Sequence, residues 1–277
     1  MQIIWLASYP KSGNTWMRIL LGHYFADKTE TIHNGFVRVG AISSHRPSFD
    51  ELTGLASSDL IHSEIDLLRP DFYRALSQLA SNDPFIKAHD SYHKNNLDEW
   101  IFPADCSKGV IYIVRHPFDV AVSLTHHWGN KNYMKAVKFM IDSNAFLSGK
   151  GRSHQIRQLT QSWSQHYKSW TQQTDIPVLI VRYEDMLANT AKEFTRVLEF
   201  LNHPNINELD IKKVINATQF QKLRQLEDNE GFMERHEKSD RFFRSGRSGE
   251  GLEKLPTKLQ EDILKKHSAV MEELGYI

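Results

Sequence analysis

The chain has 277 residues, a length that suits one large domain or two small ones. Its 34 basic residues (Lys and Arg) balance 34 acidic ones, and its hydrophobic fraction of 40% is ordinary for a soluble globular protein. The zero formal net charge excludes a global field that would steer the protein to nucleic acid or an anionic membrane, so any anion site must be local.

These and related features predict a cytoplasmic protein with no nucleic-acid partner and no membrane partner. No apolar run approaches the roughly 20 residues that cross a bilayer. The residues after Met1 form no signal peptide, because Pro10 and Lys11 interrupt the first apolar run too early. The single cysteine, Cys106, excludes an internal disulfide and fits a reducing compartment. Nothing beside Cys106 marks an activated thiol, so we interpret it as a small buried residue.

The most informative stretch begins with a short apolar run at residues 3–7, which predicts a buried strand, and ends in a helical pattern over residues 16–25. The turn between them carries Lys11, Ser12, Gly13, Asn14 and Thr15. Free N–H groups at the helix start, the positive end of its dipole, a lysine and two hydroxyls together predict a phosphate or sulfate site. The alternative is a plain strand–turn–helix corner without a ligand.

This turn differs from the usual nucleoside-triphosphate loop. That motif places its lysine after the second of two glycines and follows it with a hydroxyl for magnesium. Here Lys11 precedes Gly13, the only glycine of the turn, and no glycine comes earlier in the chain. The lysine is therefore expected to approach the anion from the strand side.

Further strands and helices alternate along the chain. Apolar runs rich in β-branched residues predict buried strands at residues 84–88, 110–114 and 177–181. Helical spacing predicts helices at residues 117–128, 153–173, 190–201 and 256–274, the third of them opened by a capping box of Thr190 and Glu193. This alternation predicts a single α/β domain over residues 1–277, with three layers and a central parallel sheet flanked by helices.

Three long stretches have weak patterns: residues 33–59, 142–152 and 228–251. We interpret them as excursions or lids, since long loops usually bind something or move.

The second predicted strand ends in Lys87 and His89, which project to the same side because side chains alternate along a strand. Ligands of parallel sheets bind at the carboxyl ends of the strands. The pair therefore suggests a cation for developing charge beside a general base, a role that suits histidine near neutral pH. The alternative is a surface lysine and a histidine bonded to a backbone carbonyl.

The third predicted strand ends in Arg115 and is followed by Ser123. An arginine and a hydroxyl at this edge can hold a second phosphate, although a structural salt bridge explains the arginine equally well. Two anion sites on one sheet edge suit a nucleotide with two separated phosphates. The basic, glycine-rich residues 241–249 are either a flap that closes over an anion or a solvated loop.

Taken together, these motifs resemble those of the cytosolic-type sulfotransferases that use 3′-phosphoadenosine 5′-phosphosulfate (PAPS). Residues 9–16 (YPKSGNTW) resemble the family's loop for the 5′-phosphosulfate, and residues 112–123 resemble its 3′-phosphate segment, with matches at Arg115, Asp119 and Ser123. Residues 178–186 resemble the strand that ends beside the adenine, and residues 243–246 resemble the flap over the 3′-phosphate. The match extends from near Met1 to about residue 249 in the order of the family.

The resemblance implies a P-loop-like fold and transfer of a sulfuryl group from PAPS to a hydroxyl or amine, with PAP released and no metal needed. It suggests a bacterial enzyme that acts on a small molecule. The implied catalytic residues are Lys11 and Lys87 as cations and His89 as base. The implied cofactor-binding residues are Lys11, Ser12, Gly13, Asn14, Thr15, Trp16, Arg115, Ser123, Tyr183, Thr218, Phe220, Arg244, Ser245 and Gly246.

The flap departs from the family pattern, in which Arg-Lys-Gly precedes Gly-Asp-Trp. Ser245 stands at the lysine position, and Gly249, Glu250 and Gly251 stand at the later triplet. This departure weighs against the second cation and the tryptophan contact, and Arg244 and Arg247 are candidates to compensate.

Two other functions remain open at this stage: a nucleotide kinase that uses ATP with magnesium, and a nucleotide- or partner-binding protein without catalysis. The acceptor is not readable from the sequence. Residues 33–59, 92–100 and 130–152 are expected to form its walls, and a homodimer stays open.

Overall fold

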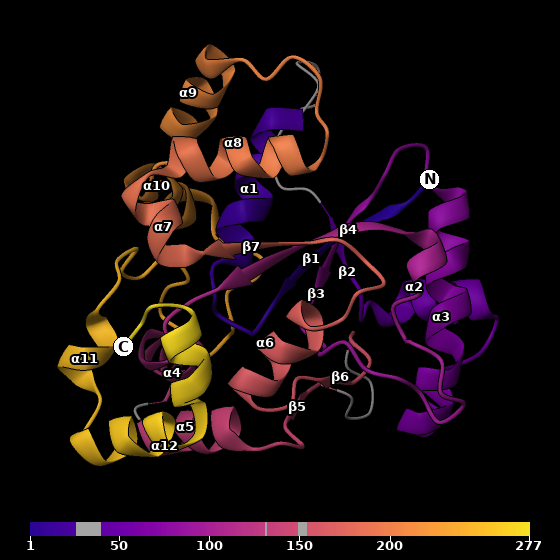
Figure 1. Ribbon diagram of the computed structural model, residues 1–277, viewed down its shortest axis with the longest axis horizontal. Coiled ribbons are helices and arrows are strands. Elements are labelled where there is room, and N and C mark those ends of the chain that lie inside the picture. Colours follow the sequence, from indigo (N-terminus) through magenta and orange to yellow (C-terminus); the bar gives the residue numbers. More distant parts are fainter. Residues whose placement is uncertain (26–39, 131, 149–153) are drawn as a thin grey trace. The chain divides into compact units, whose positions relative to one another are not determined.

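The computed structural model describes residues 1–25, 40–130, 132–148 and 154–277 (Figure 1). Its chain divides into two compact units, each assembled from three segments. The first unit comprises Met1–Tyr9, Gly40–Tyr112 and Asp142–Ile180, and the second comprises Pro10–Val39, Ile113–Ile141 and Val181–Ile277. The single domain over residues 1–277 stays a prediction.

A five-stranded parallel sheet with strand order β2-β3-β1-β4-β7 is the centre of the fold. Its strands are β1 (Ile3–Ser8), β2 (Ala41–Ile42), β3 (Phe85–Ala88), β4 (Ser107–Val114) and β7 (Val178–Arg182). Strand β3 pairs in parallel with both β1 and β2, and places Lys87 opposite Leu6 and Ile42. All six residues of β1 are buried, as expected for a strand covered on both faces. The predicted α/β class is confirmed.

The first unit adds helices α2 (Arg46–Thr53), α3 (His62–Leu79) and α6 (Trp163–Thr171), the short η2 (Ala104–Cys106), and an antiparallel pair of β5 (Phe146–Leu147) and β6 (Gln158–Leu159). Its core is aromatic: the Trp5 ring lies 5.0 Å from Tyr73 and 4.7 Å from Phe102, edge-on to both. Cys106 is buried, and burial raises the pKa of its thiol to about 11, which agrees with the predicted inert role.

The helix predicted over residues 153–173 is wrong in its first half. Residues 158–159 belong to β6, and α6 begins only at Trp163. Gln161 has a left-handed backbone (φ 56°), which breaks a helix, and Ser162 then caps α6 through a hydrogen bond to Gln165. Residue 153 lies outside the described residues.

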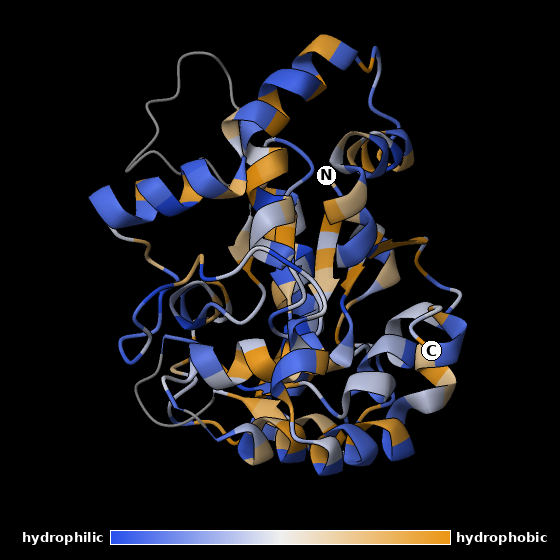
Figure 2. Cartoon of the chain, turned by 90° about the vertical axis from the view of Figure 1, so that its left-hand side faces the viewer, coloured by the Kyte–Doolittle hydropathy of each residue, from blue (hydrophilic) through white to orange (hydrophobic). Residues whose placement is uncertain are grey.

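The second unit consists of helices and connecting turns: α1 (Asn14–Phe25), α4 (Pro117–His127), α5 (Tyr133–Ile141), α7 (Tyr183–Ala188), α8 (Thr190–Phe200), α9 (Glu208–Ala217), α10 (Phe220–Glu230), α11 (Glu250–Lys254) and α12 (Thr257–Glu273). The predicted helices at 16–25, 117–128, 190–201 and 256–274 are confirmed to within two residues. The predicted capping box is wrong, because Asn189 caps α8 by accepting from the Lys192 N–H, while the Thr190 hydroxyl donates to the Met186 carbonyl. The helices carry both hydrophobic and hydrophilic residues (Figure 2), as expected for helices with one buried face.

The weakly patterned stretches are more ordered than expected. Residues 33–59 include β2 and α2, and residues 142–152 include β5. Residues 228–230 complete α10, whereas residues 231–249 form turns. Residues 33–39 and 149–152 lie outside the described part of the chain.

Candidate functional site

The turn between β1 and α1 has the backbone of an anion-binding loop. Gly13 has φ 106°, and Lys11 has φ 70°, a conformation that a residue with a side chain seldom adopts. The Gly13 carbonyl accepts from the N–H groups of Trp16 (3.0 Å) and Met17 (3.3 Å), which closes the first turn of α1. The first N–H groups of a helix have no partner within the helix, so this end of α1 is suited to an anion.

Tyr183, the first residue of α7, contacts two of the other predicted nucleotide motifs. A Cβ atom added to Gly13 would lie 2.6 Å from Tyr183 Cδ2, so the loop backbone passes directly against the ring. The Trp16 ring meets Tyr183 edge-on at 5.9 Å, and the Arg115 guanidinium carbon lies 4.4 Å from the centre of the Tyr183 ring. Burial raises the pKa of Tyr183, so its hydroxyl stays protonated. The tyrosine thus joins the 5′ loop to the end of β4.

Arg115 and Asp119 connect the end of β4 with the flap. Arg115 Nη2 donates to the Arg247 carbonyl at 3.0 Å. Both carboxylate oxygens of Asp119, in the first turn of α4, accept backbone N–H groups, from Gly249 of the flap at 2.9 Å and from Gly251 of α11 at 2.6 Å. Asp119 therefore holds the flap to α4 through the flap's main chain.

The flap also packs on α10. A Cβ atom on Gly246 would lie 2.4 Å from the Phe220 ring, so only glycine fits at this close approach. The Glu227 carboxylate accepts from the N–H groups of Phe242 (2.7 Å) and Phe243 (2.8 Å). The Phe242 ring in turn lies 4.3 Å from Lys11 Nζ, a cation–π distance.

Arg244, expected to bind a phosphate, pairs with Glu250. Its guanidinium donates to both carboxylate oxygens of Glu250, one at 2.6 Å, and Lys254 binds the same carboxylate. The hydrogen bonds from Arg244 chiefly, and those from Lys254, lower the pKa of Glu250 to about 2. Glu250 is therefore ionised throughout the neutral range.

Other predicted cofactor residues have contacts of their own. The Thr15 hydroxyl donates to Glu234 at 2.9 Å, and Arg18 binds the same carboxylate at 2.6 Å. Thr218, buried at the end of α9, donates its hydroxyl to the Val214 carbonyl and keeps its oxygen as an acceptor. Ser123 is half-buried on α4.

The buried polar atoms without a hydrogen-bond partner among the described residues include Ser12 Oγ, Arg115 Nε and Ser245 Oγ, and others lie elsewhere in both units. Buried polar groups are nearly always bonded, so such atoms require an explanation. Each of the three named atoms belongs to a different predicted phosphate-binding motif, and each can donate to a phosphate oxygen. These residues therefore fit a nucleotide with two separated phosphates.

The first unit holds the other predicted catalytic residues, Lys87 and His89, at the carboxyl end of β3. His89 is buried, and its Nδ1 lies 2.8 Å from the Ser8 carbonyl oxygen. Because a carbonyl can only accept, Nδ1 carries the proton in the neutral ring, and the lone pair is on Nε2. The predicted alternative of a histidine bonded to a backbone carbonyl is thus observed, and this bond orients the ring as a base would need.

A buried network holds the backbone around His89. His166 Nε2 lies 3.2 Å from the His89 carbonyl, and His166 Nδ1 lies 2.7 Å from the Tyr112 hydroxyl. Complete burial lowers the pKa of His166 to about 3, so it stays neutral. The next residue, Asp90, accepts from Arg69 at 2.7 and 2.8 Å and is fully buried with it.

Sequence reasoning missed the acidic residues that position the flap and loop. Glu227 and Glu234 lie 15 or more residues from the groups that they bind, so no local spacing identifies them. The Asp119 position was recognised, but its contact with the flap was not. For His166, an apolar helix face interrupted by one histidine was the available signal.

A parallel α/β fold with a strand–turn–helix anion loop is the architecture of a nucleotide-dependent group-transfer enzyme. The chain matches the model of the sulfotransferase domain over residues 2–275 and belongs to this family. It is a PAPS-dependent sulfotransferase, whose product from the donor is PAP.

Curated relatives and solved structures agree with this family. The chain is 26% identical to flavonol 3-sulfotransferase of Flaveria bidentis, over 98% of this chain and 81% of the relative. It is 25% identical to flavonol 4′-sulfotransferase of Flaveria chlorifolia, over 95% of this chain and 77% of the relative. Its fold is similar to mouse sulfotransferase SULT7A1 complexed with PAP, with a TM-score of 0.62 and 19% identity over 96% of this chain and 85% of that one.

The described residues contain no group of three or more histidine, cysteine, aspartate or glutamate residues that could hold a metal ion. None of their helices is both long and apolar enough to cross a membrane.

Proposed function

We propose that this chain sulfates a hydroxyl group of a small molecule, and that its second unit binds the nucleotide through the predicted motifs. The observation that carries the assignment of the nucleotide site is the set of buried donors without partners at Ser12, Arg115 and Ser245. These three atoms lie in three predicted phosphate-binding segments of one unit, and each costs stability if it stays unbonded.

The loop and the flap have separate tasks in this proposal. The loop residues Ser12, Gly13, Asn14 and Thr15 hold the 5′-phosphate with backbone N–H groups and hydroxyls. The 3′-phosphate is bound by Arg115, Ser123, Arg244, Ser245 and Gly246. The adenine lies against Trp16, Tyr183, Thr218 and Phe220. The Gly13–Tyr183 and Gly246–Phe220 contacts support these groupings, because each brings a phosphate segment against an adenine residue.

When bound, PAPS supplies an activated sulfuryl group. Such transfers require mainly positioning and stabilisation of developing charge, here provided by ammonium groups in place of a metal. Lys11 neutralises the charge that develops on the leaving phosphate, and Lys87 assists at the transferred group. His89 accepts the acceptor's proton at Nε2, the nitrogen left basic by the bond from Nδ1 to Ser8.

The relatives support a small-molecule acceptor. The names of two of them refer to flavonols and that of another, from Photinus pyralis, to luciferin. We propose a hydroxyl of a comparably small organic molecule, with an amine as the alternative, and the cytoplasm as the compartment. Tyr92–Trp100 stacking at 4.4 Å lies within the predicted acceptor wall at residues 92–100. A homodimer remains a proposal.

The cofactor is tested by thermal shift with PAP, with ATP plus magnesium, and with ATP alone. Stabilisation by PAP without magnesium supports the proposal, because a ligand that binds only the folded state raises its melting temperature. Stronger stabilisation by ATP plus magnesium would favour the kinase alternative. A screen with labelled PAPS over phenols, sterols, sugars and peptides then identifies the acceptor class, and binding without turnover on any of them would favour the non-catalytic alternative.

A further inference from the structure

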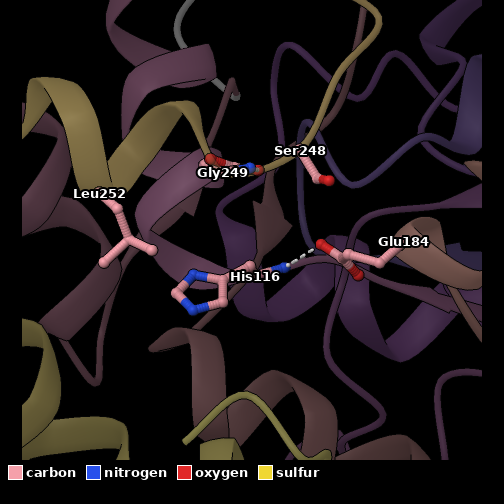
Figure 3. Close-up of a pocket in the computed structure, with 6 residues that line it drawn as sticks. His116, Glu184, Ser248, Gly249 and Leu252 are labelled. Carbon is pink, nitrogen blue, oxygen red and sulfur yellow. Dashed lines mark hydrogen bonds between the residues drawn. The ribbon is translucent and has the colours of Figure 1, made fainter.

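Tyr276, which follows α12, is joined to the end of β4 through one carboxylate. Its hydroxyl donates to Glu184 Oε2 at 2.9 Å. The other oxygen of the same carboxylate, Glu184 Oε1, accepts from the His116 backbone N–H at 3.0 Å (Figure 3). Glu184 thus spans two segments that are 160 residues apart in the chain.

The Tyr276 ring reinforces this arrangement. It lies 4.8 Å from the His116 ring and 4.7 Å from the Arg182 guanidinium carbon. Burial and the adjacent Glu184 carboxylate raise the pKa of Tyr276 far above its usual value, so its hydroxyl remains a donor. Three contacts of different kinds therefore fix the tyrosine against β7, α7 and the start of α4.

The two residues that this cluster holds, His116 and Glu184, each directly follow a proposed nucleotide contact in the chain. His116 follows Arg115, and Glu184 follows Tyr183, over whose ring the Arg115 guanidinium lies at 4.4 Å. The direction of the Arg115 side chain depends on its backbone, on the Tyr183 ring and on the contacts of Nη2 with the Arg247 carbonyl and Asp119, while Nε has no partner among the described residues.

A cavity adjoins the hydrogen bonds of Glu184. About 190 Å3 of empty space lies beside the cluster, lined by His116, Asp119, Glu184, Ser248, Gly249 and Leu252 (Figure 3). This volume is below the roughly 300 Å3 at which ligand pockets begin. His116 and Glu184 both line the cavity, and the hydrogen bond from the His116 N–H to Glu184 lies at its wall.

We propose that Tyr276 is a positioning residue for recognition of the 3′-phosphate, acting through Glu184 on the backbone that carries Arg115. The inference rests on the proposed function, in which Arg115 binds this phosphate. It assigns a task in nucleotide selection to a residue outside every motif of the site.

The test compares PAP with 5′-AMP, which lacks the 3′-phosphate, on Tyr276→Phe. Loss of a hydrogen bond to a charged acceptor is expected to weaken PAP binding about 5- to 20-fold. Binding of 5′-AMP should change less than about twofold, so the preference for PAP falls. Isothermal titration of both ligands on the full chain gives this ratio directly. Tyr133→Phe, the same chemical change on α5, is the matched control and should leave the ratio unchanged.

A purely structural role predicts a different result: Tyr276→Phe would lower the melting temperature and weaken both ligands equally, and that would overturn the inference. Glu184→Gln is the second variant; it should reduce the PAP preference similarly, and adding Tyr276→Phe to it should reduce the preference little further. Full additivity of the two changes would also contradict the inference. If the unmodified chain does not prefer PAP over 5′-AMP, the proposed function itself fails instead.

Discussion

The backbone of Gly13 passes so close to the ring of Tyr183 that a Cβ atom there would lie 2.6 Å from Cδ2. This contact connects the loop proposed for the 5′-phosphate with the residue proposed to lie beside the adenine. It also leaves no space for any side chain at position 13, where φ is already 106°.

Gly13→Ala should therefore abolish most PAP binding. The left-handed backbone alone costs about 1–2 kcal/mol for alanine, and the clash must also displace Tyr183. Gly54→Ala is a matched control, because Gly54 has φ 69° at the end of α2 but nothing within 4 Å of an added Cβ. Both variants should melt at lower temperature, whereas only Gly13→Ala should lose PAP in titration calorimetry. Normal PAP affinity in Gly13→Ala would remove the loop from the nucleotide site.

His89→Asn tests the proposed base. The amide can keep a donor near the Nδ1 position, toward the Ser8 carbonyl, while removing the basic Nε2. General bases contribute about 100- to 10,000-fold, so turnover of labelled PAPS should fall by at least about 100-fold. PAP affinity should stay within about twofold, since the nucleotide residues belong to the second unit. Turnover near that of the unmodified enzyme would assign the base to another group.

Stability should depend on pH through His166. Its pKa is lowered by burial from 6.5 to about 3 in the folded state, so the unfolded chain binds the extra proton between these values. The stabilisation is complete above pH 6.5 and is lost as the pH falls toward 3. At pH 5 the stability lost through His166 is about 2 kcal/mol, because the pH has fallen 1.5 units below 6.5 and each unit costs about 1.36 kcal/mol.

Urea unfolding of His166→Gln measures this contribution. The variant should be less stable than the unmodified chain at pH 7.5, and the difference should shrink by about 2 kcal/mol at pH 5. Other histidines titrate alike in both proteins, so they cancel in the comparison. An equal difference at both pH values would mean that His166 is not the titrating group.

Glu250→Gln should tighten PAP binding about two- to fivefold. In the unmodified chain, the Glu250 carboxylate occupies the Arg244 guanidinium and stays ionised with a pKa of about 2, so a phosphate must compete with it. Glu253→Gln is the control: Glu253 pairs with Arg247, both side chains are exposed, and such pairs contribute little. Titration of both variants with PAP at fixed ionic strength compares their affinities. Weaker PAP binding in Glu250→Gln would mean that the Glu250 carboxylate positions Arg244 for the phosphate instead of competing with it.

The local parts of the fold were predictable from the sequence because their signals are local. Strand β1, the turn at Lys11 and Gly13 and helix α1 follow one another within 25 residues, and each has its own hydrophobic pattern. Strand β2 was missed, since two residues have no periodicity and join the sheet only by pairing with β3. Residues 158–159 were assigned to a helix because Leu159 fits an apolar stripe, yet pairing with β5 determines their structure.

The residues of the candidate site were likewise predictable only where their signal is local. Motif residues such as Arg115 and Tyr183 were recognised from their neighbours in the chain. The roles of Glu184 and Glu227 were not recognised, because their carboxylates bind the backbone N–H groups of His116 and Phe243, and every residue except proline has such a group. Nothing in the sequence indicates which carboxylate will receive such a bond.

The hydrogen bonds that Asp119 accepts from the N–H groups of Gly249 and Gly251 have a consequence for protein engineering. Because this attachment uses no flap side chain, residues 244, 245, 247 and 248 can be exchanged without detaching the flap from α4, whereas Gly246 must stay glycine. The flap is thus a natural place to redesign which nucleotide the enzyme accepts.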